Sequence, residues 1–168
     1  MTGIGKKAPC LLLLIAATLA LSACGVKPAD ISEYENDTIL ISGLLDEDFY
    51  ITVREIADLE CVSRTATGAT EKAGTVSATG PLLDTFLAQY GYKASDFDRI
   101  RFYAADQYRT VLRGEYLTDY EVVLAVSSGS EPLAEGLRPL RLFIPEAESN
   151  IWIYMVEHIE FVQEDTPR

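Results

Sequence analysis

Hydrophobic and polar positions alternate along much of the chain with the two-residue period that is typical of half-buried β-strands. The clearest example is 99–104, where Ile100, Phe102 and Ala104 alternate with arginines and a tyrosine. Residues 122–126 are apolar throughout and predict a strand that is covered on both faces. Further short extended segments are expected at 38–42, 49–51, 60–66, 74–79, 108–113, 140–144 and 151–162.

Helix signals are fewer. Thr52 and Glu55 have capping-box spacing, which predicts a short helix ending near Leu59. Pro81 is a favourable first helical residue, and Gly91 marks the end of a second helix. Its apolar stripe consists of Leu82, Leu83, Phe86, Leu87 and Tyr90. Many short strands with two short helices predict a single β-rich domain of the α+β class.

The N-terminus has the pattern of a targeting segment rather than of a folded element. Lys6 and Lys7 precede an eleven-residue segment at 11–21 that is apolar except for Thr18, and small residues then lead to Cys24. This order resembles the lipobox of bacterial lipoproteins. The resemblance implies a signal peptide at 1–23 and a lipid on Cys24. An ordinary secretory signal or an uncleaved anchor helix is the alternative.

A lipidated Cys24 would attach the protein to the cell envelope. It would lie on the outer side of the cytoplasmic membrane, or on the outer membrane if the envelope has two membranes. Residues 25–37 contain Pro28 and few large apolar side chains, and are expected to form a flexible tether of about 20 Å. The folded domain is placed at 38–162, with a polar tail at 163–168.

Composition excludes several classes of function. The chain has 14 Lys and Arg against 26 Asp and Glu, and a net charge of −12 argues against nucleic acid as a partner. His158 is the single histidine, so no site can use two imidazoles. Once the signal peptide is removed and Cys24 is lipidated, Cys61 would be the one free thiol.

Basic residues are concentrated at 99–113. Arg99, Arg101, Arg109 and Arg113 lie within fifteen positions that hold a single acid, Asp106. Such a cluster on a hairpin could bind an anion in an otherwise acidic protein. The alternative is a solvated face on which arginines protect an exposed strand edge.

Four motifs, in this order, resemble the molybdopterin-binding oxidoreductase domain of the sulfite oxidase type. They are TGPLLDTFL at 79–87 followed by Gly91, AADQY at 104–108, RPLRLFIP at 138–145 and IWIYMVEHIEF at 151–161. The resemblance implies a β-rich α+β fold and a molybdopterin cofactor. It also implies one cysteine thiolate on molybdenum, for which Cys61 is the candidate ligand and catalytic residue. Arg101, Arg109 and Arg141 would hold an anionic substrate.

The sequence also departs from the family pattern. Gln107 replaces a glycine, and Ile153, Tyr154 and Glu157 replace lysines near Trp152. Because the pterin cofactor is anionic, these changes favour a cofactor-free module that binds a small anionic ligand or an envelope protein. The alternative is an active molybdopterin-dependent redox enzyme or subunit that acts on a small oxyanion or a sulfoxide.

Overall fold

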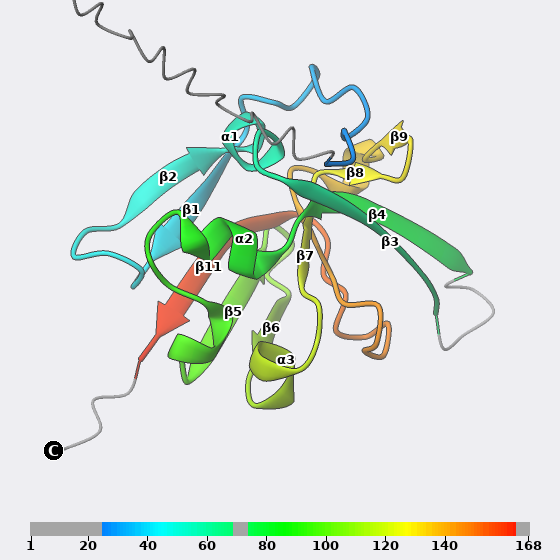
Figure 1. Cartoon of the computed structure of the whole chain (residues 1–168). Coiled ribbons are helices and arrows are strands. Elements are labelled where there is room, and N and C mark those ends of the chain that lie inside the picture. Colours follow the sequence, from blue (N-terminus) through cyan, green and yellow to red (C-terminus); the bar gives the residue numbers. More distant parts are fainter. Residues whose placement is uncertain (1–24, 69–73, 164–168) are drawn as a thin grey trace, which may run out of the picture.

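The computed structural model describes residues 25–68 and 74–163, and its largest element is a five-stranded mixed sheet (Figure 1). The strand order is β2-β1-β11-β5-β6, with β1 parallel to β11 and the other pairs antiparallel. The strands are β1 (Thr38–Ser42), β2 (Phe49–Thr52), β5 (Arg99–Ala104), β6 (Arg109–Leu112) and β11 (Val156–Val162).

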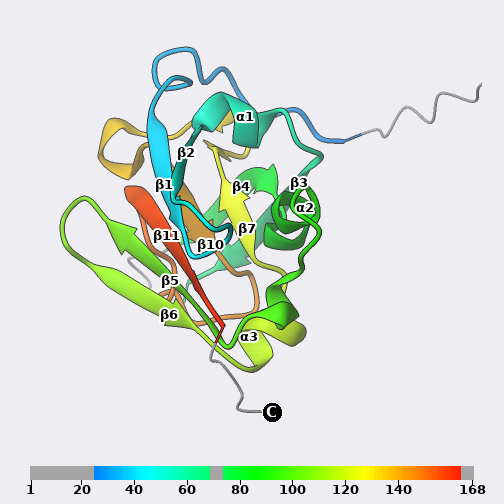
Figure 2. The ribbon, with the colours of Figure 1, turned by 90° about the vertical axis from the view of Figure 1, so that its left-hand side faces the viewer.

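One face of this sheet forms the main core. Ile39 and Ile41 of β1, Phe102 of β5 and Ile159 of β11 are fully buried there. Figure 2 shows the five strands on one side of the molecule. On the other side lie α1 (Val53–Ala57), α2 (Leu83–Ala88), β4 (Thr75–Pro81) and β7 (Val123–Ala125). The sheet is therefore covered on one face by the helices and by the remaining strands.

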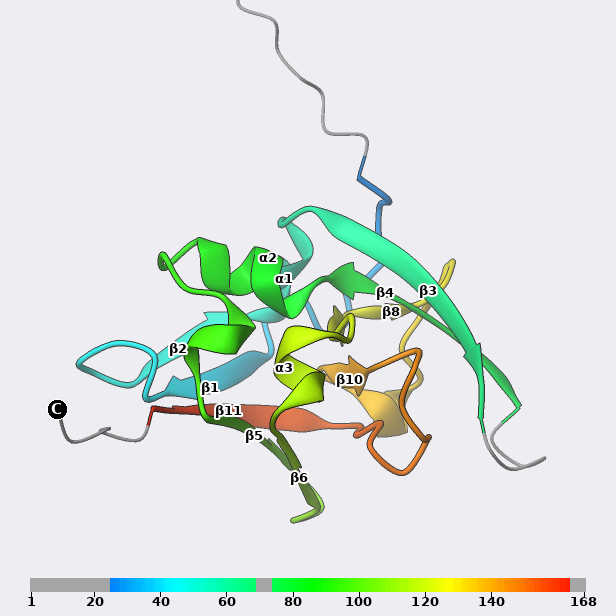
Figure 3. The ribbon, with the colours of Figure 1, turned by 60° about the horizontal axis from the view of Figure 1, so that its bottom comes forward.

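Two smaller sheets complete the domain. One has the order β3-β4-β8-β9 and the other pairs β7 with β10. Figure 3 shows β3 and β4 as a long curved hairpin. Their bounds are β3 (Cys61–Thr67), β4 (Thr75–Pro81), β7 (Val123–Ala125), β8 (Ser127–Ser128), β9 (Glu131–Pro132) and β10 (Arg141–Phe143); the short helices are η1 (Ala94–Asp96), α3 (Glu115–Thr118) and η2 (Glu135–Leu137).

The Thr-Gly pair of the TGPLLDTFL motif lies where β4 meets β7. A Cβ atom on Gly80 would lie 2.0 Å from the carbonyl oxygen of Leu124, so a side chain cannot be accommodated there. The amide of Val126 donates to the carbonyl of Thr79 at 2.9 Å. Glycine at this position therefore allows the two sheets to approach each other closely.

The predicted strands and the capping box of α1 are confirmed, but two boundaries were wrong. Pro81 does not begin α2, because it ends β4 opposite Cys61, and the helix begins at Leu83. The closing strand β11 begins at Val156 rather than at 151. The residues before it form a loop, in which Met155 has a positive φ of 53°.

The expectation of a flexible tether at 25–37 was also wrong. Tyr34 is buried; its hydroxyl donates to the carbonyl of Val126 at 2.7 Å and accepts from the amide of Leu133 at 3.0 Å. The amide of Val26 donates to the carbonyl of Cys61 at 3.1 Å. Residues 25–37 thus belong to the folded domain, because the buried Tyr34 and hydrogen bonds to residues distant in the sequence hold them against it.

The expected signal peptide, Cys24 and residues 164–168 of the tail lie outside the described residues. Within the described ranges, no helix has the length and apolar character needed to cross a membrane.

Candidate functional site

Arg141 is a buried cation at the start of β10. Its side chain is 3% exposed, and strand pairing places it opposite Ala125 of β7. Aromatic rings surround its guanidinium, whose carbon lies 4.6 Å from the ring centroid of Tyr154, 5.4 Å from that of Phe143 and 5.7 Å from that of Trp152. These distances allow cation–π attraction, which replaces part of the lost hydration.

The hydrogen bonds of Arg141 are incomplete. Its Nη2 donates to the hydroxyl of Tyr154 at 3.3 Å, whereas its Nε is buried without a partner. Among the described residues, no carboxylate forms an ion pair with it. Burial lowers the pKa of the Arg141 guanidinium, because the charged form loses its water. A buried guanidinium without a counter-charge attracts any anion that can reach it.

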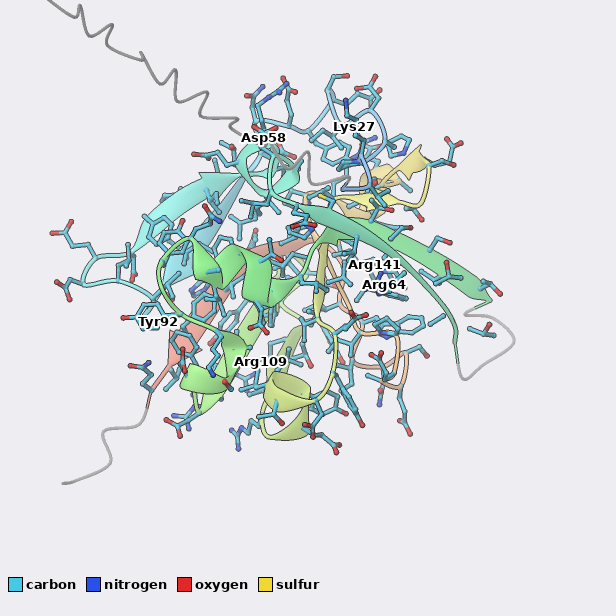
Figure 4. All side chains as sticks on the ribbon, in the orientation of Figure 1. Lys27, Asp58, Arg64, Tyr92, Arg109 and Arg141 are labelled. Carbon is cyan, nitrogen blue, oxygen red and sulfur yellow. The ribbon has the colours of Figure 1, made fainter. Side chains whose placement is uncertain are left out.

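The walls of the site come from two sheets. Arg141 borders a small apolar cluster that includes Phe143 and Trp152, and the indole nitrogen of Trp152 donates to the carbonyl of Ile144 at 2.8 Å. Arg64 lies on the face of β3 that packs on this cluster, and its Nη2 donates to Glu121 at 2.7 Å. Figure 4 shows Arg64 and Arg141 below the β3–β4 hairpin. Arg64 is therefore neutralised, and Arg141 is not.

A cavity of about 230 Å³ adjoins these walls. Trp152 and Tyr154 line it, together with Asp106, Tyr108, Asn150 and Ile153. Two of the lining tyrosines are exposed, Tyr154 to 37% and Tyr108 to 51%, so the cavity lies at the surface. The sequence pattern did not predict this arrangement, although Trp152 and Tyr154 alternate after the strand that carries Arg141.

The structure does not bring Arg101, Arg109 and Arg141 together as predicted. Arg101 and Arg109 lie on β5 and β6 of the large sheet, whereas Arg141 belongs to the β7–β10 sheet. Arg101 is already paired, since its Nη1 donates to Glu160 at 2.8 Å. Arg109 is exposed opposite Tyr103, and Figure 4 shows it well separated from Arg141. Arg141 alone of the three remains a candidate for binding a buried anion.

Cys61 lies on the opposite face of β3 from Arg64. Its thiol is 3% exposed and donates to the carbonyl of Ala57 at 3.6 Å. Burial, and then the nearby charge of Asp58, raise the pKa of Cys61 to about 11. A metal ligand must be a thiolate, and this environment keeps the thiol protonated. Among the described residues, no three His, Cys, Asp or Glu side chains are grouped as a metal site.

The AADQY motif forms a turn in which Gln107 stands where the family pattern has a glycine. Gln107 has a φ of 71°, in the left-handed region that a glycine adopts without strain. The carboxylate of Asp106 accepts from the amide of Tyr108 at 3.0 Å, which closes the turn. The turn places Tyr108 at the cavity, where its hydroxyl donates to the carbonyl of Asn150 at 3.1 Å.

Residues 28–168 match the model of the family described as the oxidoreductase molybdopterin binding domain. The chain belongs to this family. The sulfane dehydrogenase SoxCD of Paracoccus pantotrophus has a similar structure, with a TM-score of 0.62 and 19% identity. The match covers 80% of this chain but 40% of that one, so it shows the fold alone. A comparison with curated proteins found no match.

The predicted β-rich α+β fold of the sulfite oxidase type is therefore confirmed. At the level of the family, molybdopterin is the implied cofactor. The residues of this molybdopterin-binding domain do not fit a molybdenum centre held through Cys61, because that thiol is buried, protonated and turned toward the backbone of α1.

Proposed function

We propose that this domain is a ligand-binding module that holds a small anion at Arg141 and does not use Cys61 as a metal ligand. The observation that carries the proposal is the buried Nε of Arg141, which has no partner in a site without a counter-charge among the described residues. A buried unpaired charge is costly, and a carboxylate or oxyanion that accepts from the guanidinium would remove that cost.

The anion is also consistent with the overall charge. The chain carries a net charge of −12, which repels anions from most of its surface. An anion therefore needs a specific cation to bind. The guanidinium of Arg141 can be that cation, and three aromatic rings shield it from water. Hydrogen bonds to a charged group are stronger in such surroundings than in water.

Thermal unfolding in sulfate tests the proposal. Sulfate should raise the melting temperature of the wild type above that in chloride of equal ionic strength, since a ligand that binds the folded state stabilises it. Arg141→Gln should abolish this increment. Arg109→Gln removes an exposed arginine and is the matched control, in which the increment should persist. An equal sulfate response in wild type and Arg141→Gln would contradict the proposal.

Anchoring at the cell envelope is part of the same proposal. Lipidation of Cys24 would present the binding module outside the cytoplasm, where a small ligand or an envelope protein could reach it. Cys24→Ser should move the protein out of the detergent phase or block its processing. Intact mass spectrometry of the membrane-bound protein gives the direct measurement, and an unmodified Cys24 there would exclude the anchor.

The family match over residues 28–168 supports a second candidate, a molybdopterin-dependent redox enzyme or subunit. Metal analysis of protein produced in a host that makes the cofactor separates the two. We expect molybdenum well below one atom per chain. Stoichiometric molybdenum that is lost in Cys61→Ala would instead establish Cys61 as a metal ligand, and retention in that variant would mean that another group holds the metal.

A further inference from the structure

The cavity lined by Trp152 and Tyr154, whose rings also contact Arg141, limits the size of the ligand. Its volume of about 230 Å³ is below the range of roughly 300–1,000 Å³ that is usual for drug-sized molecules. It is lined on its apolar side by Tyr108, Trp152 and Ile153. Such walls suit a single aromatic ring, which stacks on or packs edge-to-face against aromatic side chains.

Nearby charged residues determine the orientation of a ligand bound in this cavity. Asp106 lines it at the turn between β5 and β6, and its carboxylate would repel a negative group. The rings of Trp152 and Tyr154 line the cavity, and the same two rings contact the guanidinium of Arg141. A ligand with an apolar ring and one anionic group is therefore bound with the anion toward Arg141.

Tyr154 is the residue that separates the cavity from the cation. Trp152 is 4% exposed and held by its bond to the carbonyl of Ile144, so it cannot move easily. Tyr154 is 37% exposed, and its hydroxyl accepts from Arg141 at 3.3 Å, beyond the usual length of such bonds. A ligand in the cavity can therefore reach the guanidinium only if Tyr154 rotates, and this rotation would free Nη2 for a new acceptor.

We infer that the ligand of this site is an aromatic carboxylate, with its ring in the cavity and its carboxylate on Arg141 in the place of the Tyr154 hydroxyl. The inference rests on the proposed function and narrows it to one chemical class. A planar carboxylate can accept two parallel hydrogen bonds from a guanidinium, which satisfies the unpartnered Nε together with Nη2.

The test uses the purified full chain and four probes: benzoate, the uncharged benzyl alcohol, acetate and sulfate. Trp152 is the single tryptophan of the chain, so its fluorescence reports on the cavity, and calorimetry supplies the dissociation constants. Benzoate should bind at least about tenfold more tightly than either benzyl alcohol or acetate, because it alone uses both the ring pocket and the cation. Arg141→Gln should reduce benzoate to the affinity of benzyl alcohol.

Tyr154→Phe keeps the ring but removes the hydroxyl that competes for Arg141. It should raise benzoate affinity by roughly three- to tenfold, since the guanidinium no longer exchanges one partner for another. Tyr50→Phe, at a 68% exposed tyrosine on β2, is the control and should leave the affinity unchanged. Tyr154→Phe and Tyr50→Phe together test whether the carboxylate displaces the Tyr154 hydroxyl, even if Arg141→Gln fails to fold.

The outcomes separate the ligand class from the proposed function. If sulfate binds in an Arg141-dependent way and benzoate binds no better than acetate, the aromatic carboxylate is wrong and the anion site stands. If benzoate and benzyl alcohol bind equally, the cavity takes rings without using the cation, and the inference fails. If no anion binds, both fail. Unchanged benzoate affinity in Tyr154→Phe would contradict the inference that the carboxylate takes the place of the Tyr154 hydroxyl on Arg141.

Discussion

Replacing Arg141 with methionine should make the protein more stable in anion-free buffer. Methionine retains an unbranched stem that can pack against Phe143, Trp152 and Tyr154, but it has no charge to desolvate and no donor to leave unpaired. Most substitutions at a buried position are destabilising, so a gain here would be specific to a residue retained for binding.

The magnitude follows from the contacts of the guanidinium. The unpartnered Nε alone costs about 1–3 kcal/mol, and desolvation of the charge adds several kcal/mol. Against these stand about 1 kcal/mol for the hydrogen bond to Tyr154 and about 2 kcal/mol for the contacts with the three rings. We therefore expect Arg141→Met to gain about 1–3 kcal/mol, within the range found when buried ionic groups are replaced by apolar ones.

Urea titration at low ionic strength measures this gain directly, and thermal unfolding should show a rise of roughly 3 °C for each kcal/mol. The same variant should lose the increment that sulfate gives to the wild type. Arg109→Met, at an exposed position of β6, is the control and should change stability by less than about 0.5 kcal/mol. A loss of 1 kcal/mol or more in Arg141→Met would refute the reasoning, because the ring contacts would then outweigh desolvation.

Three other features give predictions. Cys61 should resist alkylation at pH 8 in the folded protein, because its thiol is buried with a pKa of about 11, and Cys61→Ala should cost about 1–2 kcal/mol in urea; rapid native-state labelling would contradict this. Hydrogen bonds from Arg101 and Tyr103 lower the pKa of Glu160 from its ordinary 4.5, so their stabilisation is present above pH 4.5 and is lost below it. Glu160→Gln should therefore flatten the fall in unfolding free energy below pH 4.5, and an unchanged acid profile would exclude this origin. Tyr34→Phe should destabilise the domain by about 1–3 kcal/mol in urea by leaving two buried backbone groups unpaired, whereas a neutral effect would show that water replaces the hydroxyl.

Local pattern predicted most of the elements because burial on one face imposes its period on the sequence. Alternation located β5, and the Thr52–Glu55 pair located the start of α1, since both signals act within a few residues. The same reasoning failed for the segment around Tyr34, whose partners lie about a hundred residues away. Composition describes an average over a segment and does not reveal one anchoring side chain.

The candidate site was less predictable for a related reason. Strand periodicity shows which residues face a core but not which strands share a sheet, so Arg101 and Arg141 were placed in one site although they belong to different sheets. The acid that neutralises Arg101 is Glu160, nearly sixty residues further along the chain. An arginine within the apolar run at 140–144 was the visible anomaly, but its missing counter-charge becomes evident only in three dimensions.

The backbone bond between Val26 and Cys61 determines how far the domain could stand from a membrane. If Cys24 carries lipid, as proposed, it lies two positions before this fixed point, a reach of about 7 Å at full extension. The end of the molecule that holds Gly25 and α1 would then rest against the headgroups, and rotation of the domain would be restricted. Figures 1 and 2 show the 144–155 segment away from that end, so the cavity beside Tyr154 would face the aqueous compartment and take its ligand from solution rather than from the bilayer.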